Sequence, residues 1–196
     1  MSAALIYLHG FRSGPQSAKV QALAACMREH GLGDQLWCEQ LSPVPFDAIA
    51  QATAQIDACL KAGVQPALAG SSLGGFYAAW LANRHGLKAV LINPFVPHAG
   101  FDNNLFLGEH LPIYGGPAFH FTAAHAAQIA VLDTPQLQRP ENIWLLAEEG
   151  DETLDVRQAV ARYAACRQTV LPGGNHSFTR WADYLDAVLR FTGLLA

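Results

Sequence analysis

The sequence of 196 residues contains few charged residues, and basic residues are fewer than acidic ones. Charged residues make up 14%, and 12 Lys and Arg stand against 16 Asp and Glu, which gives a formal net charge of -4. Proteins that bind nucleic acids use clustered basic side chains to neutralise phosphates, so we expect no nucleic-acid partner. Hydrophobic residues reach 51%, which excludes a disordered chain, and the length predicts a single domain over residues 1–196.

The sequence also lacks a long hydrophobic run. None approaches the roughly 20 residues that a membrane-spanning helix requires, so we expect no membrane partner. The apolar start, Met1–Leu8, is followed at once by His9 and Arg12, and it has neither the hydrophobic length nor the cleavage site of a signal peptide. We therefore expect a cytoplasmic protein.

Cysteine pairs and common cofactor motifs are missing as well. We expect reduced thiols, because no C-x-x-C spacing occurs among the four cysteines, Cys26, Cys38, Cys59 and Cys166. The sequence has no H-E-x-x-H motif and no close His/Cys cluster, so we expect no metal. The loop after the first apolar run contains neither the G-x-G-x-x-G pattern of dinucleotide-binding folds nor the G-x-x-x-x-G-K-[ST] pattern of nucleotide triphosphatases, so we expect no cofactor.

What the sequence does contain is a regular alternation of strand and helix patterns. Six short apolar runs predict strands: Ala4–Leu8, Gln35–Glu39, Ala67–Gly70, Ala89–Ile92, Ile143–Ala147 and Gln168–Leu171. Helical patterns lie between most of them or after the last: Ser17–His30, Phe46–Lys61, Leu73–His85, Val156–Ala165 and Phe178 to about Phe191. This alternation predicts an α/β fold with a mostly parallel sheet of about six strands and helices on both faces.

Residues 93–139 interrupt the alternation after the fourth predicted strand. Prolines recur through this excursion, and the Gly115-Gly116 pair also breaks any long helix. An irregular insertion of this length is typical of a lid or a binding loop. Alternatively, a short amphipathic helix around Thr122–Val131 closes an edge of the sheet.

The most informative motif is G-x-S-x-G at Gly70–Gly74, with Ser72 at its centre. It stands where a predicted strand runs directly into a helix that begins at Leu73. Glycines on both sides of the serine allow a sharp, strained turn that exposes the hydroxyl above the sheet. We predict that Ser72 is a catalytic nucleophile, and the alternative is an ordinary turn.

A serine nucleophile requires a general base, and the chain has eight histidines. Six of them end helical patterns or lie in the irregular excursion: His30, His85, His98, His110, His120 and His125. His176 instead follows the last predicted strand in a glycine-rich loop, and catalytic groups collect at such strand ends in open α/β sheets. We predict that His176 is the base, and the alternative is a loop histidine beside the last helix.

The third member of a serine triad in this chain order is a carboxylate after the penultimate strand. Asp155 precedes a predicted helix, and Gln158 three residues later completes a capping-box pattern, so Asp155 already has a structural role. Asp151 follows the flexible Gly150 and has no such role. We therefore predict that Asp151 orients His176, with Asp155 as the alternative.

Acyl transfer also requires hydrogen-bond donors for the developing oxyanion. The first is the backbone N–H of Leu73, at the start of the helix that follows Ser72. The loop after the first strand supplies the second, because Gly10 lets its backbone approach closely and the N–H of Phe11 comes next. His9, in the same loop, is expected to pack beside the site without carrying a proton.

Five ordered stretches resemble the small bacterial esterases of the YqiA/YcfP type: Tyr7–Lys19, Gly70–Ala78, Ile92–Pro94, Gly150–Asp155 and Gly173–Phe178. The resemblance covers nearly the whole chain and implies an α/β-hydrolase fold. It also implies a cytoplasmic hydrolase of carboxylic esters or thioesters, in which Ser72, Asp151 and His176 match the nucleophile, acid and base. The segment Phe95–Phe121 matches only loosely, so the resemblance implies the chemistry and not the particular substrate.

Three functions fit these residues. The leading hypothesis is a serine esterase or thioesterase that cleaves a small-molecule ester or thioester through an acyl-enzyme on Ser72. An acyltransferase or peptidase on the same fold is the second, and it differs in whether an alcohol or amine competes with water for the acyl group. The third is a catalytically silent binding protein, which would have no need of a complete serine, acid and histidine set.

Overall fold

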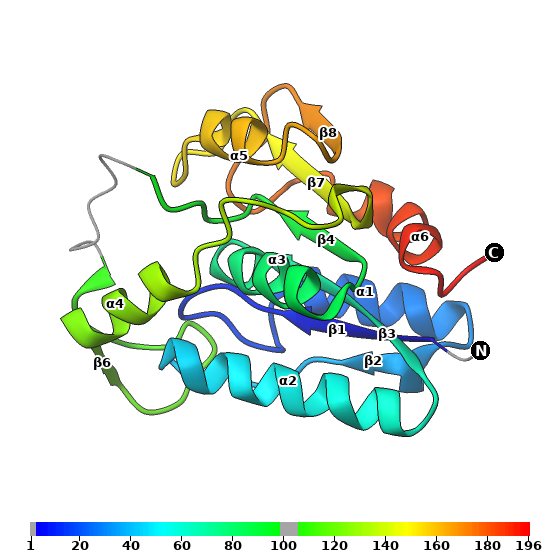
Figure 1. Ribbon diagram of the computed structural model, residues 1–196, viewed down its shortest axis with the longest axis horizontal. Helices are drawn as coiled ribbons and strands as arrows, with labels where there is room; N and C mark the ends of the chain where they lie inside the picture. The colour runs from blue at the N-terminus through cyan, green and yellow to red at the C-terminus, as the bar shows by residue number, and fades with distance from the viewer. Residues whose placement is uncertain (1–2, 99–105) are drawn as a thin grey trace.

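A parallel sheet of six strands organises the chain, which we describe from a computed structural model covering residues 3–98 and 106–196 (Figure 1). The strands are β1 (Ala3–Leu8), β2 (Leu36–Trp37), β3 (Gln65–Ser71), β4 (Ala89–Ile92), β7 (Ile143–Glu148) and β8 (Arg167–Leu171). Their order across the sheet is β2-β1-β3-β4-β7-β8, and all neighbours are parallel. Each of the six predicted runs forms one of these strands.

Helices cover both faces of this sheet (Figure 1). One face carries α1 (Ala18–Glu29) and α6 (Trp181–Thr192), and the other carries α2 (Pro45–Lys61), α3 (Leu73–His85) and α5 (Val156–Arg162). Short 3-10 turns, η1 (Gly33–Gln35) and η3 (Pro140–Asn142), precede β2 and β7. The predicted α/β fold with helices on both faces is confirmed.

The hydrophobic core has two layers, one on each face of the sheet, because successive side chains along each strand point to opposite faces. In β1, Leu5 and Tyr7 point to the α1 and α6 side, whereas Ile6 and Leu8 point to the α2 and α3 side. All four side chains are buried, and the same alternation holds in β3, β4 and β7. Because both faces are covered, these strands are nearly continuous hydrophobic runs, which is why they stand out in the sequence.

Two helix boundaries differ from the prediction by more than one residue. The last helix begins at Trp181 and not at Phe178, because Phe178 has a φ of 55° and cannot continue a right-handed helix. Helix α5 ends at Arg162 and not at Ala165, since the chain turns there: Cys166 N–H donates to the Tyr163 carbonyl at 2.9 Å, directly before β8.

The excursion over residues 93–139 contains regular structure that the sequence analysis missed. Within its described part, β5 (Gly108–His110) and β6 (Phe119–Phe121) pair as an antiparallel hairpin. Helix α4 (Ala123–Val131) follows, capped by Thr122, and matches the short helix considered above. It packs beside α2, where Phe46 N–H donates to the Gln128 side chain at 3.0 Å (Figure 1). The part of the predicted excursion at residues 99–105 lies outside the described residues.

Two further expectations concern the cysteines, predicted to be reduced, and the absence of a membrane-spanning helix. All four cysteines lie in the described part of the chain and are free thiols, as expected. Among the described helices, none has both the length and the hydrophobicity needed to cross a membrane.

Candidate active site

The predicted site residues all lie just beyond the carboxyl ends of the parallel strands. Ser72 follows β3, Asp151 follows β7 and His176 follows β8. In open parallel sheets, this edge is where loops from different strands converge and where ligands bind. Residues separated by about a hundred positions in the chain therefore meet here.

Ser72, His176 and Asp151 form one hydrogen-bonded line. The Ser72 hydroxyl lies 3.1 Å from His176 Nε2, and His176 Nδ1 lies 2.8 Å from Asp151 Oδ2. The other carboxylate oxygen of Asp151 accepts the N–H groups of Thr153 at 2.9 Å and Leu154 at 2.8 Å, which fixes its orientation. The Asp151 side chain is 3% exposed and that of His176 is 23% exposed, so the imidazole is open to solvent while the carboxylate is shielded.

The backbone at Ser72 is strained in the way that the glycine pattern predicts. Its φ of 55° and ψ of -122° lie outside the regions that non-glycine residues prefer. Neighbouring backbone holds it in place, since Ser72 N–H donates to Ile92 O at 3.0 Å. A side chain at Gly70 would collide with the Gly74 carbonyl, and one at Gly74 would collide with the Leu8 carbonyl. The turn can therefore form only with glycine at both positions.

The two predicted oxyanion donors flank Ser72. Leu73 is the first residue of α3, where N–H groups have no acceptor within the helix and are free to bind an anion. The loop after β1 approaches from the other side, because a Cβ at Gly10 would lie 3.2 Å from Cβ of Ser72. Phe11 follows directly. The structure thus brings the loop that carries Phe11 to the serine, and Phe11 and Leu73 line the same cavity.

His9 joins this loop to the loop after β2. It is buried, its Nε2 accepts the N–H of Leu41 at 2.9 Å, and its Nδ1 therefore carries the proton and donates to the Gly10 carbonyl at 2.9 Å. Burial lowers the pKa of His9, which favours this neutral form. Both ring nitrogens therefore form hydrogen bonds that hold the two loops together.

A buried carboxylate that the sequence analysis gave no role organises the loop bearing His176. Glu148, the last residue of β7, is 0% exposed. Its two oxygens accept the N–H groups of Asn175, Thr179 and Arg180, together with the Thr179 hydroxyl and Nε of Arg180, at 2.9 to 3.2 Å. Gly174 lets the loop pass directly over this carboxylate, because any side chain there would collide with it.

These contacts keep Glu148 ionised in spite of its burial. Burial raises the pKa of a carboxyl group, but the hydrogen bonds from Thr179, Asn175 and Arg180 outweigh it and lower the pKa of Glu148 to about 2. A charged acceptor makes each of these bonds stronger than a neutral one would. The loop around His176 is therefore anchored to the end of β7 by one carboxylate.

Asn93 and Lys19 hold the same loop from two other directions. The Asn93 amide donates to the carbonyls of Asn175 at 3.0 Å and His176 at 3.1 Å, while its oxygen accepts the N–H of Glu148 at 2.9 Å. From α1, the Lys19 ammonium donates to the Ser177 carbonyl at 2.8 Å. Both residues lie in the stretches that carry the family resemblance, but their spacing alone gives no sign of this role.

Asp155, the alternative acid, lies at the start of α5. Its carboxylate accepts the N–H of Arg157 at 3.0 Å and pairs with the Arg157 guanidinium at 2.8 Å. It is the N-cap that the sequence predicted, but the predicted capping box is wrong: the Gln158 side chain donates to the Asp155 carboxylate at 3.5 Å, and the cap bond goes to Arg157. The carboxylate that is hydrogen-bonded to His176 is that of Asp151 and not that of Asp155.

Aromatic rings from the excursion surround Phe11. The Phe11 ring meets four others edge to face at centroid distances of 4.9 to 5.5 Å: Phe106, His110, Phe119 and Phe121. Three of these four rings belong to the β5–β6 hairpin. The hairpin therefore supports the loop that carries the second predicted oxyanion donor.

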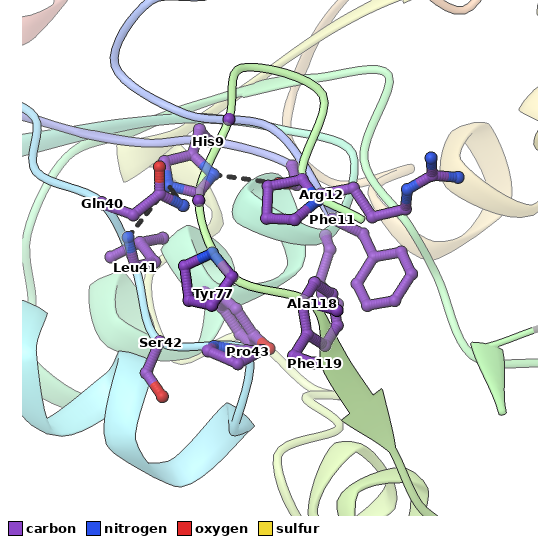
Figure 2. Close-up of a pocket in the computed structure, with 16 residues that line it drawn as sticks. His9, Phe11, Arg12, Gln40, Leu41, Ser42, Pro43, Tyr77, Ala118 and Phe119 are labelled. Carbon is purple, nitrogen blue, oxygen red and sulfur yellow. Dashed lines mark hydrogen bonds between the residues drawn. The ribbon is translucent and has the colours of Figure 1, made fainter. Parts of the chain in front are cut away.

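A cavity of about 170 Å³ opens beside this loop (Figure 2). Its walls come from the loops after β1 and β2, from α3 and from the segment between β5 and β6. Gly10, Phe11 and Leu73 line it, so it adjoins the predicted oxyanion site. Figure 2 also shows His9, another lining residue, hydrogen-bonded to its neighbours.

One group of metal-ligating side chains occurs among the described residues, between α1 and α6. Cys26, His30 and Asp186 place their ligand atoms within 4.8 Å of one another. Hydrogen bonds already join them, since Asp186 accepts from His30 at 2.9 Å and from Cys26 at 3.5 Å. Burial and the Asp186 carboxylate raise the pKa of Cys26 to about 11, which disfavours the thiolate that metals bind. We interpret this group as a hydrogen-bonded link between two helices.

Comparisons with known proteins agree with this architecture. A model of an uncharacterised protein family, UPF0227, matches residues 4–193. Among solved structures, the chain is similar to the metagenome-derived lipolytic enzymes LipS and LipT, with a TM-score of 0.72 and 16% identity over 99% of this chain and 96% of that one. It is also similar to Est1E from Butyrivibrio proteoclasticus with bound ferulic acid, with a TM-score of 0.66 and 17% identity over 96% of this chain and 87% of that one.

A third similar structure is the esterase domain of a Rhodothermus marinus protein, with a TM-score of 0.63 and 17% identity over 95% of this chain and 84% of that one. At these identities the likeness establishes the shared α/β-hydrolase fold. The family match covers nearly the whole chain and agrees with the resemblance to YqiA/YcfP-type esterases. The chain therefore belongs to the UPF0227 family and has the α/β-hydrolase fold.

Proposed function

We propose that the protein is a serine hydrolase that cleaves carboxylic esters or thioesters. The observation that carries this proposal is the continuous line from the Ser72 hydroxyl through His176 to Asp151, with contacts of 3.1 and 2.8 Å. Such a line allows the imidazole to take the hydroxyl proton while the carboxylate stabilises the imidazolium that forms. The three similar structures, described as an esterase, lipolytic enzymes and a protein with bound ferulic acid, support ester chemistry on this fold.

The proposed reaction has two halves. Ser72 Oγ attacks the carbonyl carbon, its proton passes to His176 Nε2, and the carbonyl oxygen becomes an anion that the N–H groups of Phe11 and Leu73 stabilise. When the tetrahedral intermediate collapses, the alcohol or thiol leaves with the proton from His176, and an acyl-enzyme remains. Water then attacks the acyl carbon and gives a proton to His176. When the second tetrahedral intermediate collapses, the bond to Ser72 Oγ breaks, His176 returns the proton to Oγ, and the acid is released.

We propose two further properties of this hydrolase. The segment between β5 and β6 lines the cavity next to the loop after β1, which supports a lid role for the 93–139 excursion within a single domain. The four free thiols support a reducing compartment such as the cytoplasm.

Hydrolysis of matched substrates tests the proposed function. Purified wild type is expected to hydrolyse p-nitrophenyl butyrate and the corresponding thioester, whereas Ser72→Ala should lose roughly a million-fold in kcat, as serine enzymes do without their nucleophile. Ser71→Ala is the matched control and should keep its activity. Unchanged hydrolysis by Ser72→Ala would refute the proposal. Addition of methanol separates a hydrolase from an acyltransferase, because an acyltransferase would form the methyl ester in preference to the acid.

A further inference from the structure

The position of the cavity identifies which half of the substrate it accepts. Gly10, Phe11 and Leu73 line it, whereas Ser72, Asp151 and His176 do not. In the proposed reaction the leaving group must lie next to His176, because it receives its proton from Nε2. The cavity lies on the oxyanion side of the carbonyl and is therefore available to the acyl group.

The size and lining of the cavity restrict that acyl group. Its volume of about 170 Å³ is close to the roughly 150 Å³ of an apolar protein cavity known to hold benzene. Leu41, Pro43, Pro117 and Phe119 give it a largely apolar wall. An acyl chain of about six carbon atoms fits this space, whereas a long fatty chain would extend beyond it.

One polar group in this apolar wall is left without a partner. Tyr77 lies one helical turn after Leu73 on the same face of α3 and lines the cavity. It is 4% exposed, and no side chain or backbone group in the described parts of the chain forms a hydrogen bond with its hydroxyl. Burial raises the pKa of Tyr77, so the hydroxyl stays neutral and can donate.

We propose that this cavity is the acyl site and that it selects short acyl groups bearing a hydroxyl or keto oxygen, which hydrogen-bonds to Tyr77. The inference rests on the proposed ester or thioester hydrolase. A hydroxyl that lines an apolar cavity without a hydrogen-bond partner favours a ligand that bonds to it, and it discriminates against analogues that lack the matching atom. Tyr77 is four residues along the helix from Leu73, a rise of about 6 Å, so the oxygen it binds belongs to the chain and not to the reacting carbonyl.

The test compares kcat/KM for p-nitrophenyl esters that differ in one feature. The series contains acetate, hexanoate and decanoate, together with 3-hydroxyhexanoate and 5-oxohexanoate. Wild type is expected to prefer hexanoate to decanoate, and to prefer at least one oxygenated ester to plain hexanoate by about tenfold, as one hydrogen bond allows. Tyr77→Phe removes only the hydroxyl and should reduce that preference to about one, while hydrolysis of hexanoate continues.

Tyr163→Phe is the matched control. Tyr163 is another buried tyrosine on the same face of the sheet, but it does not line the cavity. Its variant should keep the wild-type preference for the oxygenated ester. In a second variant, Ala118→Phe, a larger side chain in the cavity wall should reduce kcat/KM for hexanoate about tenfold while sparing acetate.

Three results would overturn the inference: no preference for either oxygenated ester in wild type, the same preference in Tyr77→Phe as in wild type, or faster hydrolysis of decanoate than of hexanoate. Each of these leaves the serine hydrolase itself intact, because the esters are still cleaved and Ser72 is still required. If wild type cleaves no ester in the series and fails to react with a fluorophosphonate, the proposed function fails and the acyl site fails with it.

Discussion

The two sides of Ser72 are held by different forces. On the base side, the loop at residues 172–180 is fixed by hydrogen bonds to a buried charge, Glu148, and to the amide of Asn93. On the oxyanion side, Phe11 is held by edge-to-face contacts with rings of the excursion. Charged hydrogen bonds depend on individual atoms, whereas ring packing is spread over many weak contacts.

This difference predicts unequal sensitivity to substitution. The base side should fail when a single polar atom is changed, because a proton must be transferred along a line of defined geometry. Single changes on the oxyanion side should have smaller effects, because the remaining rings still hold the loop. The following substitutions test that contrast.

Asp151→Asn should have the largest effect. An amide cannot hold His176 in the reactive tautomer or stabilise its charged form, so kcat should fall by about 10,000-fold. The melting temperature should change little, because the Asn oxygen can still accept the N–H groups of Thr153 and Leu154. Ester hydrolysis and thermal unfolding by circular dichroism measure both quantities. Wild-type activity in this variant would remove Asp151 from the proposed triad.

Glu148→Gln should rank second. The neutral side chain weakens the bonds to Thr179, Asn175 and Arg180, and it should reduce the free energy of unfolding by roughly 2–3 kcal/mol. Because the loop also positions His176, we expect kcat to fall about 10- to 100-fold with little change in KM. Glu149→Gln is the control, since Glu149 is an exposed neighbour and should affect neither quantity.

The pH dependence of unfolding shows how much of the stabilisation by Glu148 is due to its charge. Its pKa is lowered from 4.5 to about 2 in the folded protein, so its ionised form stabilises the fold above pH 4.5, and this contribution is lost as pH falls towards 2. Between these pH values, urea unfolding should show a steeper loss of stability in wild type than in Glu148→Gln. Parallel curves for the two proteins would show that the charge contributes nothing to stability.

Phe119→Leu tests the oxyanion side and should have a smaller effect. It removes ring contacts with Phe11 and His110 but leaves Phe106 and Phe121 against Phe11. We expect kcat/KM for p-nitrophenyl acetate to fall roughly three- to tenfold, because a short acyl group is insensitive to the cavity wall while the donor loop loosens. A loss as large as that in Asp151→Asn would contradict the contrast between the two sides.

Asp155 should have the smallest effect on activity. Asp155→Asn should change neither kcat nor stability appreciably, because Asn is about as good an N-cap as Asp. Asp155→Ala should cost about 1 kcal/mol of stability and spare most of the activity. Kinetics and urea unfolding of both variants, beside Asp151→Asn, distinguish the cap from the acid.

The same contrast explains what the sequence could predict. The six strands are apolar on both faces, and the turn at Ser72 has glycines at fixed positions, so both features show in local patterns. The sequence pattern predicts the start of α6 three residues too early, because the apolar spacing of Phe178 carries no information about its φ of 55°. Local patterns therefore indicate which elements form, and they indicate their ends less well.

Features that depend on distant partners were missed. Glu148 ends a hydrophobic strand, and its partners lie 27 to 32 residues further along the chain. The strands β5 and β6 have three residues each, too few to show an alternation among prolines and glycines. The rings around Phe11 come from this hairpin and its surroundings, about a hundred residues from the loop that they support. No local pattern reports such contacts.

Fluorophosphonate labelling with peptide mapping tests the central claim most directly, because it asks which atom is the nucleophile. The account predicts one adduct per chain, located on the peptide that contains Ser72, with labelling lost in Ser72→Ala and retained in Ser71→Ala. An adduct on another residue, or undiminished labelling of Ser72→Ala, would contradict it.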